Sequence, residues 1–253
     1  TSDSGNLTLV KYDKEKKDFV TLSNEPYYKT GSRRLSPGDY VAIDGKSRAC
    51  MVASIEKTRF VYTFRRDGDG LLSMSSPIDA SKSKLLTFDI CALDVGFENP
   101  LFAAIECNYG DYENNKHKDD VQIKKTLSYY ELDLGLNHVV KKYTETLDQD
   151  SNFMLSLPGG IDGPSGFLLC SENLIQYKYL SKMTHCLPIP KREDNKDAPT
   201  FIVSGIVHKM KRTFFVLLQS NFGDLYKISF DFDPQDSDET NGEGGALNSI
   251  EIS

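Results

Sequence analysis

Residues 214–230 read FFVLLQSNFGDLYKISF, and this stretch decides the fold prediction for the chain. The apolar run 214–219 is followed by a short polar segment and then by the more amphipathic run 225–230. Apolar runs of this length, bounded by Asn, Gly and Asp, are typical of β-strands joined by a tight turn. The stretch therefore predicts a hairpin in which one strand is buried on both faces and the next is partly exposed.

Three further copies of this two-strand unit precede it, at residues 49–64, 101–132 and 167–177. The copies are separated by 53, 65 and 48 residues, taking as equivalent positions Cys50, Ala103, Leu168 and Val216. Units of about this size are typical of propeller blades. We predict an all-β fold, a β-propeller of about four blades plus a trailing strand, although periodicity alone does not exclude several sandwich hairpins. Because the chain has no Trp, it is not a WD-type propeller.

The composition excludes several classes of protein. No apolar run approaches the roughly 18 residues that span a bilayer, so we predict no membrane segment. The 30 Lys and Arg residues are scattered in pairs and are outnumbered by 37 Asp and Glu, giving a net charge of −7. This distribution argues against direct nucleic-acid binding, which requires a basic stripe. The odd number of widely spaced cysteines predicts free buried thiols in a reducing compartment, with candidates Cys50, Cys91, Cys107, Cys170 and Cys186.

The ends of the chain and two polar segments bear on its domain organisation. The chain opens at TSDSG, residues 1–5, and we interpret this as a turn feeding a strand in a piece of a longer protein. Residues 1–253 are accordingly predicted to be part of one domain. Residues 108–125 and 231–245 are rich in polar and charged residues, which predicts mobile, solvated insertions.

Two motifs resemble ligand-binding or catalytic loops only in part. PGGIDGPSG, residues 158–166, lacks the Lys-Ser/Thr of a phosphate-binding loop, and Ser165 lacks the pair of glycines, one two residues before and one two residues after, that a nucleophile elbow requires. We predict a hairpin connection with several positive-φ positions. DGDG, residues 67–70, lacks the third acid and the closing Glu of a calcium loop, so a turn is predicted there.

No constellation of metal ligands or catalytic groups emerges. His185 and Cys186, with Cys170 sixteen residues before Cys186, lack the paired spacing of a zinc site. Three carboxylates could supply an acid and a base at a propeller funnel, namely Asp94, Glu98 and Glu106. Asp94 and Glu98, however, lie in a predicted turn, and His138 is predicted at a strand edge. We predict no enzyme activity, no cofactor, no metal and no catalytic residue, and we assign no partner-binding residues.

Five strings together resemble a known family. They are DVGFENP (94–100), ELDLGLNHVV (131–140), PGGIDGPSGFLLCSEN (158–173), PIPKR (188–192) and the pair His208-Lys209 followed by Gly223-Asp224. These strings resemble the first β-propeller of the large triple-propeller subunit of splicing factor 3b. The family also includes the large subunits of the damaged-DNA-binding complex and of the cleavage and polyadenylation specificity factor.

The resemblance implies a domain organisation, a function and a complex to which the protein belongs. It implies part of an incomplete seven-bladed ring at the N-terminus of a multi-propeller protein. It also implies a non-enzymatic, nuclear scaffold in the branch-site ribonucleoprotein, bound to the helical-repeat subunit and to small subunits of splicing factor 3b, with little or no direct RNA contact. The alternatives are a propeller adaptor of a ubiquitin ligase or of the polyadenylation machinery, or a propeller that binds nucleic acid directly.

Overall fold

The computed structural model describes most of the chain. The described residues are 6–26, 39–56, 58–66, 68, 70, 72–94, 96–110, 124–180, 185–194, 197–211, 213–233 and 246–253. The proposed opening turn (1–5), the two aspartates of the DGDG motif and most of the two polar insertions lie outside these residues. No helix in the described part is long and apolar enough to cross a membrane.

Four antiparallel sheets form four consecutive blades, each a meander of strands in chain order. Blade 1 comprises β3 (Asp39–Ile43), β4 (Ala49–Ser54), β5 (Arg59–Arg66) and, sharing the fourth position, β6 (Leu72–Met74) and β7 (Ile78–Asp79). Blade 2 comprises β8 (Leu85–Ala92), β9 (Leu101–Asn108), β10 (Lys125–Asp133) and β11 (His138–Thr146). Blade 3 comprises β12 (Phe153–Ser156), β13 (Phe167–Ser171), β14 (Leu174–Lys178) and β15 (His185–Pro188). Blade 4 comprises β16 (Ile202–Lys209), β17 (Phe214–Ser220), β18 (Leu225–Asp233) and β19 (Ala246–Ile252).

The propeller prediction is confirmed, with one difference in how each blade is built. The two-strand units found in the sequence are the second and third strands of each blade, and the expected trailing strand is β19, which completes blade 4. The continuously apolar strand is therefore not the innermost. The first strands, β3, β8, β12 and β16, lie next to one another around the axis. They are less uniformly buried than the second strands, so their apolar signal in the sequence is weaker.

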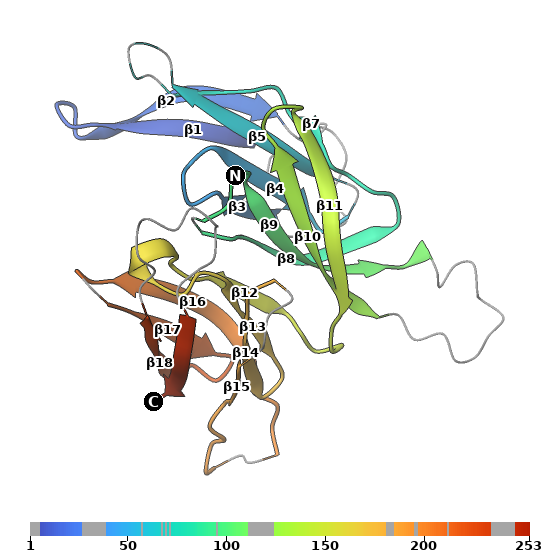
Figure 1. The fold of residues 1–253 in the computed structure, drawn as a ribbon, viewed down its shortest axis with the longest axis vertical. Coiled ribbons are helices and arrows are strands. Elements are labelled where there is room, and N and C mark those ends of the chain that lie inside the picture. Colours follow the sequence, from blue (N-terminus) through green and yellow to red (C-terminus); the bar gives the residue numbers. More distant parts are fainter. Residues whose placement is uncertain are drawn as a thin grey trace.

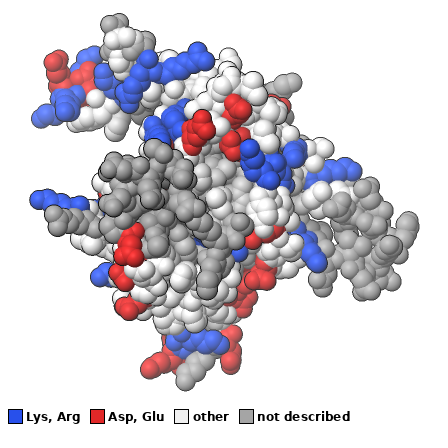
Figure 2. All heavy atoms as spheres, viewed as in Figure 1, with Lys and Arg blue, Asp and Glu red and all other residues white. Residues whose placement is uncertain are grey.

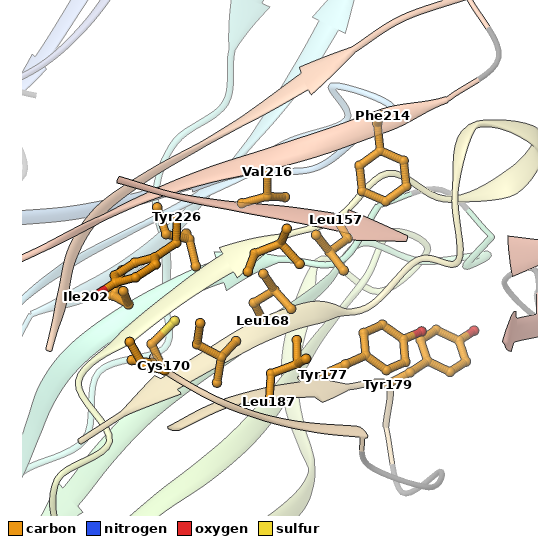
Figure 3. Close-up of a cluster of buried hydrophobic side chains, with 14 residues drawn as sticks. Leu157, Leu168, Cys170, Tyr177, Tyr179, Leu187, Ile202, Phe214, Val216 and Tyr226 are labelled. Carbon is orange, nitrogen blue, oxygen red and sulfur yellow. The ribbon is translucent and has the colours of Figure 1, made fainter. Parts of the chain in front are cut away.

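Each junction between neighbouring sheets has its own apolar cluster. The cluster between blades 3 and 4 is built around Leu168, Val216 and Ile228 and is drawn in Figure 3, where side chains from the two sheets point toward one another. Equivalent clusters join blade 1 to blade 2 and blade 2 to blade 3. Every residue of β4, β9 up to Cys107, and β13 is buried, because these strands are covered on both faces.

A separate hairpin, formed by β1 (Asn6–Asp13) and β2 (Asp18–Pro26), packs Leu7 against Cys50, Val52 and Tyr62 of blade 1. Figure 1 shows this hairpin and blade 4 at opposite ends of the molecule.

The hairpin reproduces the outer half of blade 2 position by position. The register of β1–β2 shifts between Leu9 and Val10, and that of β10–β11 shifts between Tyr129 and Tyr130, 120 residues further along the chain. Asp13 and Asp133, which end the first strands of the two hairpins, are separated by the same interval. The hairpin therefore has the structure of the third and fourth strands of a blade.

Candidate functional site

Connections between the first and second strands of the four blades lie at one end of the propeller and bind one another. Arg48, in the β3–β4 turn, pairs with Asp44 at 2.9 Å and donates through Nη1 to the backbone oxygens of Phe97 (3.3 Å) and Glu98 (2.5 Å) in the β8–β9 connection. We call this end, with the four connections and the adjoining β10–β11 turn, the loop face. The connections hold each other in place, so the loop face is a rigid surface.

Asp94 joins the loop-face connections of three blades. Its Oδ2 accepts a hydrogen bond from the backbone N–H of Gly159 at 3.0 Å, and Lys209 Nζ lies 3.8 Å from the same oxygen. Gly45 of blade 1 is so close that an added Cβ would meet the Asp94 carboxylate. The strings DVGFENP and PGGIDGPSG, which carry the family resemblance, thus meet at this residue. Lys209 also lies 3.9 Å from Asp162.

The Gly-rich stretch 158–166 is the connection between β12 and β13, as predicted. It contains the short 3₁₀ helix η1 (Gly160–Asp162) and has positive φ at Gly160, Ser165 and Gly166. An added Cβ on Gly166 would lie 2.4 Å from the carbonyl oxygen of Lys178, so only glycine fits there. Ser165 is buried, and its N–H donates to the carbonyl oxygen of Pro158 at 2.7 Å. These positions shape the chain and do not present a nucleophile.

The three candidate carboxylates do not share a site. Asp94 faces the blade 3 connection, Glu98 is exposed, and Glu106 is buried at the junction of blades 1 and 2. An acid and a base that act together must reach the same substrate, so this set supplies no acid–base pair.

Glu106 instead forms a buried charged cluster. Arg59 of blade 1 pairs with its Oε1, Tyr130 donates to the same oxygen at 2.6 Å, and Lys141 Nζ lies 3.3 Å from Oε2. Arg59 Nη2 also donates to Thr87 Oγ1 at 2.9 Å. Burial alone would raise the pKa of Glu106, but the charge of Arg59, the Tyr130 hydroxyl and Lys141 outweigh it and hold the pKa below its usual range. The carboxylate is ionised and clamps blade 1 to blade 2.

Asp89 is a further interblade carboxylate, which does not appear among the candidate residues predicted from the sequence. It lies at a bulge of β8 and accepts hydrogen bonds from the backbone N–H of Met154 in blade 3 (2.6 Å) and of Ile90 (2.8 Å). Burial raises the pKa of Asp89 to about 7, even though both hydrogen bonds favour the ionised form. A polar residue inside an apolar strand is the one sequence signal that could have identified it.

The thiols and the two candidate imidazoles are spread over blades 1, 2 and 3. Cys50, Cys91, Cys107 and Cys170 are free and buried, as predicted, whereas Cys186 is free but exposed on β15. His185 lies beside the ring of Tyr177, and His138 begins the edge strand β11, as expected. In the described part of the chain no group of three His, Cys, Asp or Glu residues is arranged to hold a metal ion.

Among the described residues, charges of both signs are interspersed on the face of the molecule seen in Figure 2. Several apolar side chains are exposed on or beside the loop face, including Ile161, Met210 and Leu136. The fold defines a class of protein, a β-propeller of the non-WD type.

Comparison with known proteins identifies the family. A family model described as the RSE1/DDB1/CPSF1 first beta-propeller matches residues 1–252. The chain therefore belongs to this family of first β-propellers, which confirms the resemblance found in the sequence.

Several relatives are similar along nearly the whole chain. Pre-mRNA-splicing factor prp12 of Schizosaccharomyces pombe is 42% identical over 253 residues, covering 93% of this chain and 21% of its own length. Splicing factor 3B subunit 3 of Drosophila melanogaster is 42% identical over 238 residues, covering 92% of this chain and 19% of its own length. Spliceosome-associated protein 130 A of Arabidopsis thaliana is 41% identical over 232 residues, with 91% and 19% covered. The chain thus spans about one fifth of the length of these relatives.

Proposed function

We propose that this chain belongs to a non-enzymatic scaffold subunit of splicing factor 3b, within the ribonucleoprotein that recognises the intron branch site. The observation that carries the proposal is the identity of 41–42% to two proteins named as splicing factors and one named as spliceosome-associated, over more than nine tenths of the chain. The proposed location is the nucleus. The proposed partners are the helical-repeat subunit and the small subunits of the same factor.

Two features of the molecule support a scaffold. Two of the three carboxylates that could have served catalysis, Asp94 and Glu106, are used for contacts between blades. The net charge of −7 and the interspersed surface charges favour protein partners over direct RNA contact.

Depletion of the parent protein is the direct test of this function. We expect introns to accumulate unspliced, and we expect the tagged parent protein to co-purify with the helical-repeat and small subunits of splicing factor 3b. A degradable tag with RNA sequencing and mass spectrometry measures both effects. The proposal would be rejected if introns were spliced normally after depletion and these subunits were absent from the proteins that co-purify with the tagged parent protein. RNA binding by the purified protein that weakens steeply with salt would instead favour the direct nucleic-acid reader.

We also propose that residues 1–253 are part of a seven-bladed first propeller whose remaining strands come from elsewhere in a multi-propeller parent protein. The hairpin β1–β2 supports this at one end. Tyr12 is 49% exposed, whereas its equivalent in blade 2, Leu132, is fully buried against blade 1. Val10 is likewise exposed, whereas its equivalent in blade 2, Tyr130, is buried. The hairpin has the apolar face that would pack on a preceding blade, but that face is uncovered.

Blade 4 supports the same proposal at the other end. In β17 buried residues alternate with more exposed ones, whereas β9 and β13 are buried on both faces. The uncovered face includes Ile206, which is 63% exposed. Apolar faces of this kind on a blade indicate a missing neighbour.

The ring proposal predicts opposite effects of one substitution in two settings. Expressed alone, residues 1–253 are expected to aggregate or to form a loosely packed state, because two blade faces are open. Ile206→Ser is expected to improve the solubility of this isolated chain but to destabilise the parent protein by about 2 kcal/mol or more, because it places a hydroxyl at a covered apolar junction. Static light scattering and thermal unfolding measure the two effects.

The matched control for this experiment is Ile161→Ser on the loop face, which is expected to leave the stability of the parent protein unchanged. A sharp, cooperative melt of the isolated chain, or an equal response of the parent to both substitutions, would contradict the open ring.

A further inference from the structure

One N–H group of the buried Arg59 side chain has no acceptor among the described residues. This side chain lies at the junction of blades 1 and 2, with 4% of its surface exposed. Nη1 donates to Glu106 and Nη2 donates to Thr87 Oγ1 at 2.9 Å, but Nε has no hydrogen-bond partner. A buried N–H of a charged group is costly to leave unpaired. The Nε–H group therefore calls for an acceptor that the protein itself does not supply.

The planar guanidinium fixes the direction in which this N–H points. Nε–H and one N–H of Nη2 leave the plane of the group along the same edge, and that edge faces Thr87. The ring of Tyr130 covers a face of the plane, with its centre 4.6 Å from Arg59 Cζ. The unpaired N–H consequently points along the plane, to the side on which Thr87 lies.

A small pocket lies beside this edge of Arg59. It has a volume of about 10 Å³. Its walls come from the β4–β5 turn, the start of β5, the β7–β8 connection and the start of β8, with lining residues Thr58, Arg59, Ser81, Lys82, Leu85 and Thr87. A volume of this size holds about one water molecule. The size of the pocket therefore selects a single water over a larger ion or an organic group.

Two hydroxyl groups of the pocket have hydrogen-bonding capacity left for a water. Thr87 Oγ1 accepts from Arg59 Nη2, and no described residue accepts its O–H. Ser81 Oγ accepts from the backbone N–H of Arg59 at 2.9 Å and donates to the carbonyl oxygen of Arg59 at 3.2 Å, which leaves one lone pair. Arg59 Nε and Thr87 can thus donate to a water, and Ser81 can accept from it. Buried waters in proteins make about three hydrogen bonds, so this set is sufficient.

We propose that one ordered water molecule binds in this pocket and completes the buried cluster of Arg59 and Glu106. The water joins blade 1, through Arg59 Nε, to blade 2, through the Thr87 hydroxyl. Because Glu106 already pairs with the guanidinium, the pocket requires a polar partner and not a further counter-charge.

The test is a crystal structure of the full-length parent protein at a resolution that shows ordered waters. We expect a density peak at about 2.7–3.2 Å from Arg59 Nε. Thr87→Val preserves the shape of the side chain but replaces the hydroxyl by a methyl group, and it is expected to lose the peak. The matched variant Thr87→Ser keeps the hydroxyl and is expected to retain the peak. Equally strong peaks in both variants would overturn the bridge to Thr87.

The wild-type map decides the proposal even if a variant fails to fold. Other buried waters resolved without a peak beside Arg59 Nε, or Nε bonded to a protein oxygen, would overturn it. Crystals soaked in bromide provide the second measurement. No anomalous signal is expected in the pocket, whereas a signal there would show that the site takes an anion instead of a water.

Discussion

Replacement of Glu106 by Gln is expected to destabilise the junction of blades 1 and 2 by about 3 to 5 kcal/mol. The substitution preserves the size of the side chain but removes the carboxylate that pairs with Arg59, whose guanidinium is buried and also lies 4.6 Å from the ring centre of Tyr130. A buried cation without a counter-charge keeps its desolvation penalty and loses the attraction that offset it. Hydrogen exchange of the β5 and β9 amides in the parent protein measures the loss as a faster local opening.

The control for this prediction is Asp194→Asn, which weakens an exposed pair with Arg192 and is expected to cost less than about 1 kcal/mol. The double replacement Arg59→Met with Glu106→Leu is expected to cost less than Glu106→Gln alone, because no charge of that pair is then left unpaired. Exchange rates in β5 and β9 that match those of the control variant would show that Glu106 is not an interblade clamp.

Truncation of Phe167 to Ala is expected to lower the free energy of unfolding by about 3 to 5 kcal/mol. Phe167 is fully buried in β13 at the junction of blades 2 and 3, with its ring centre 6.3 Å from that of Tyr129. The truncation removes apolar contacts from both blades and leaves a cavity that two paired sheets cannot close. Denaturant unfolding of the parent protein, followed by hydrogen exchange in β13, measures the effect.

The matched comparison is Ile161→Ala, an apolar truncation at an exposed position of η1, with an expected change within about 0.5 kcal/mol. Equal losses for the two truncations would mean that the blade 2–blade 3 cluster does not determine stability.

The all-β class and the repeated units could be predicted because second strands of blades are buried on both faces. This burial selects continuous apolar runs such as residues 101–105 of β9, which can be recognised in the sequence of this chain alone. The turn at 158–166 could be predicted for a similar local reason, since positive φ favours glycine. The first strands were harder to assign, because their burial depends on neighbours around the axis.

The contacts of individual charged residues could not be predicted. The sequence offers Glu106 as a candidate acid or base at the central funnel of the propeller. In the structure it lies instead in a cluster with Arg59, 47 residues earlier, and Lys141, 35 residues later. Asp89 meets a backbone N–H of Met154, 65 residues away. Such pairings depend on how the sheets pack, which no local pattern encodes.

The sequence by itself determined an all-β chain of repeated two-strand units without the WD signature, because apolar strand runs and turn chemistry are local properties, and its five matched strings indicated the family. Only the tertiary structure decided that four blades are complete among the described residues and that β1–β2 repeats the outer half of a blade. The physical reason is that interblade burial, ion pairing and exposure are set by segments far apart in the chain. The opening stretch 214–230 shows this dependence. Its first strand is apolar throughout and is predicted to be buried on both faces, but in the structure β17 is covered on one face only.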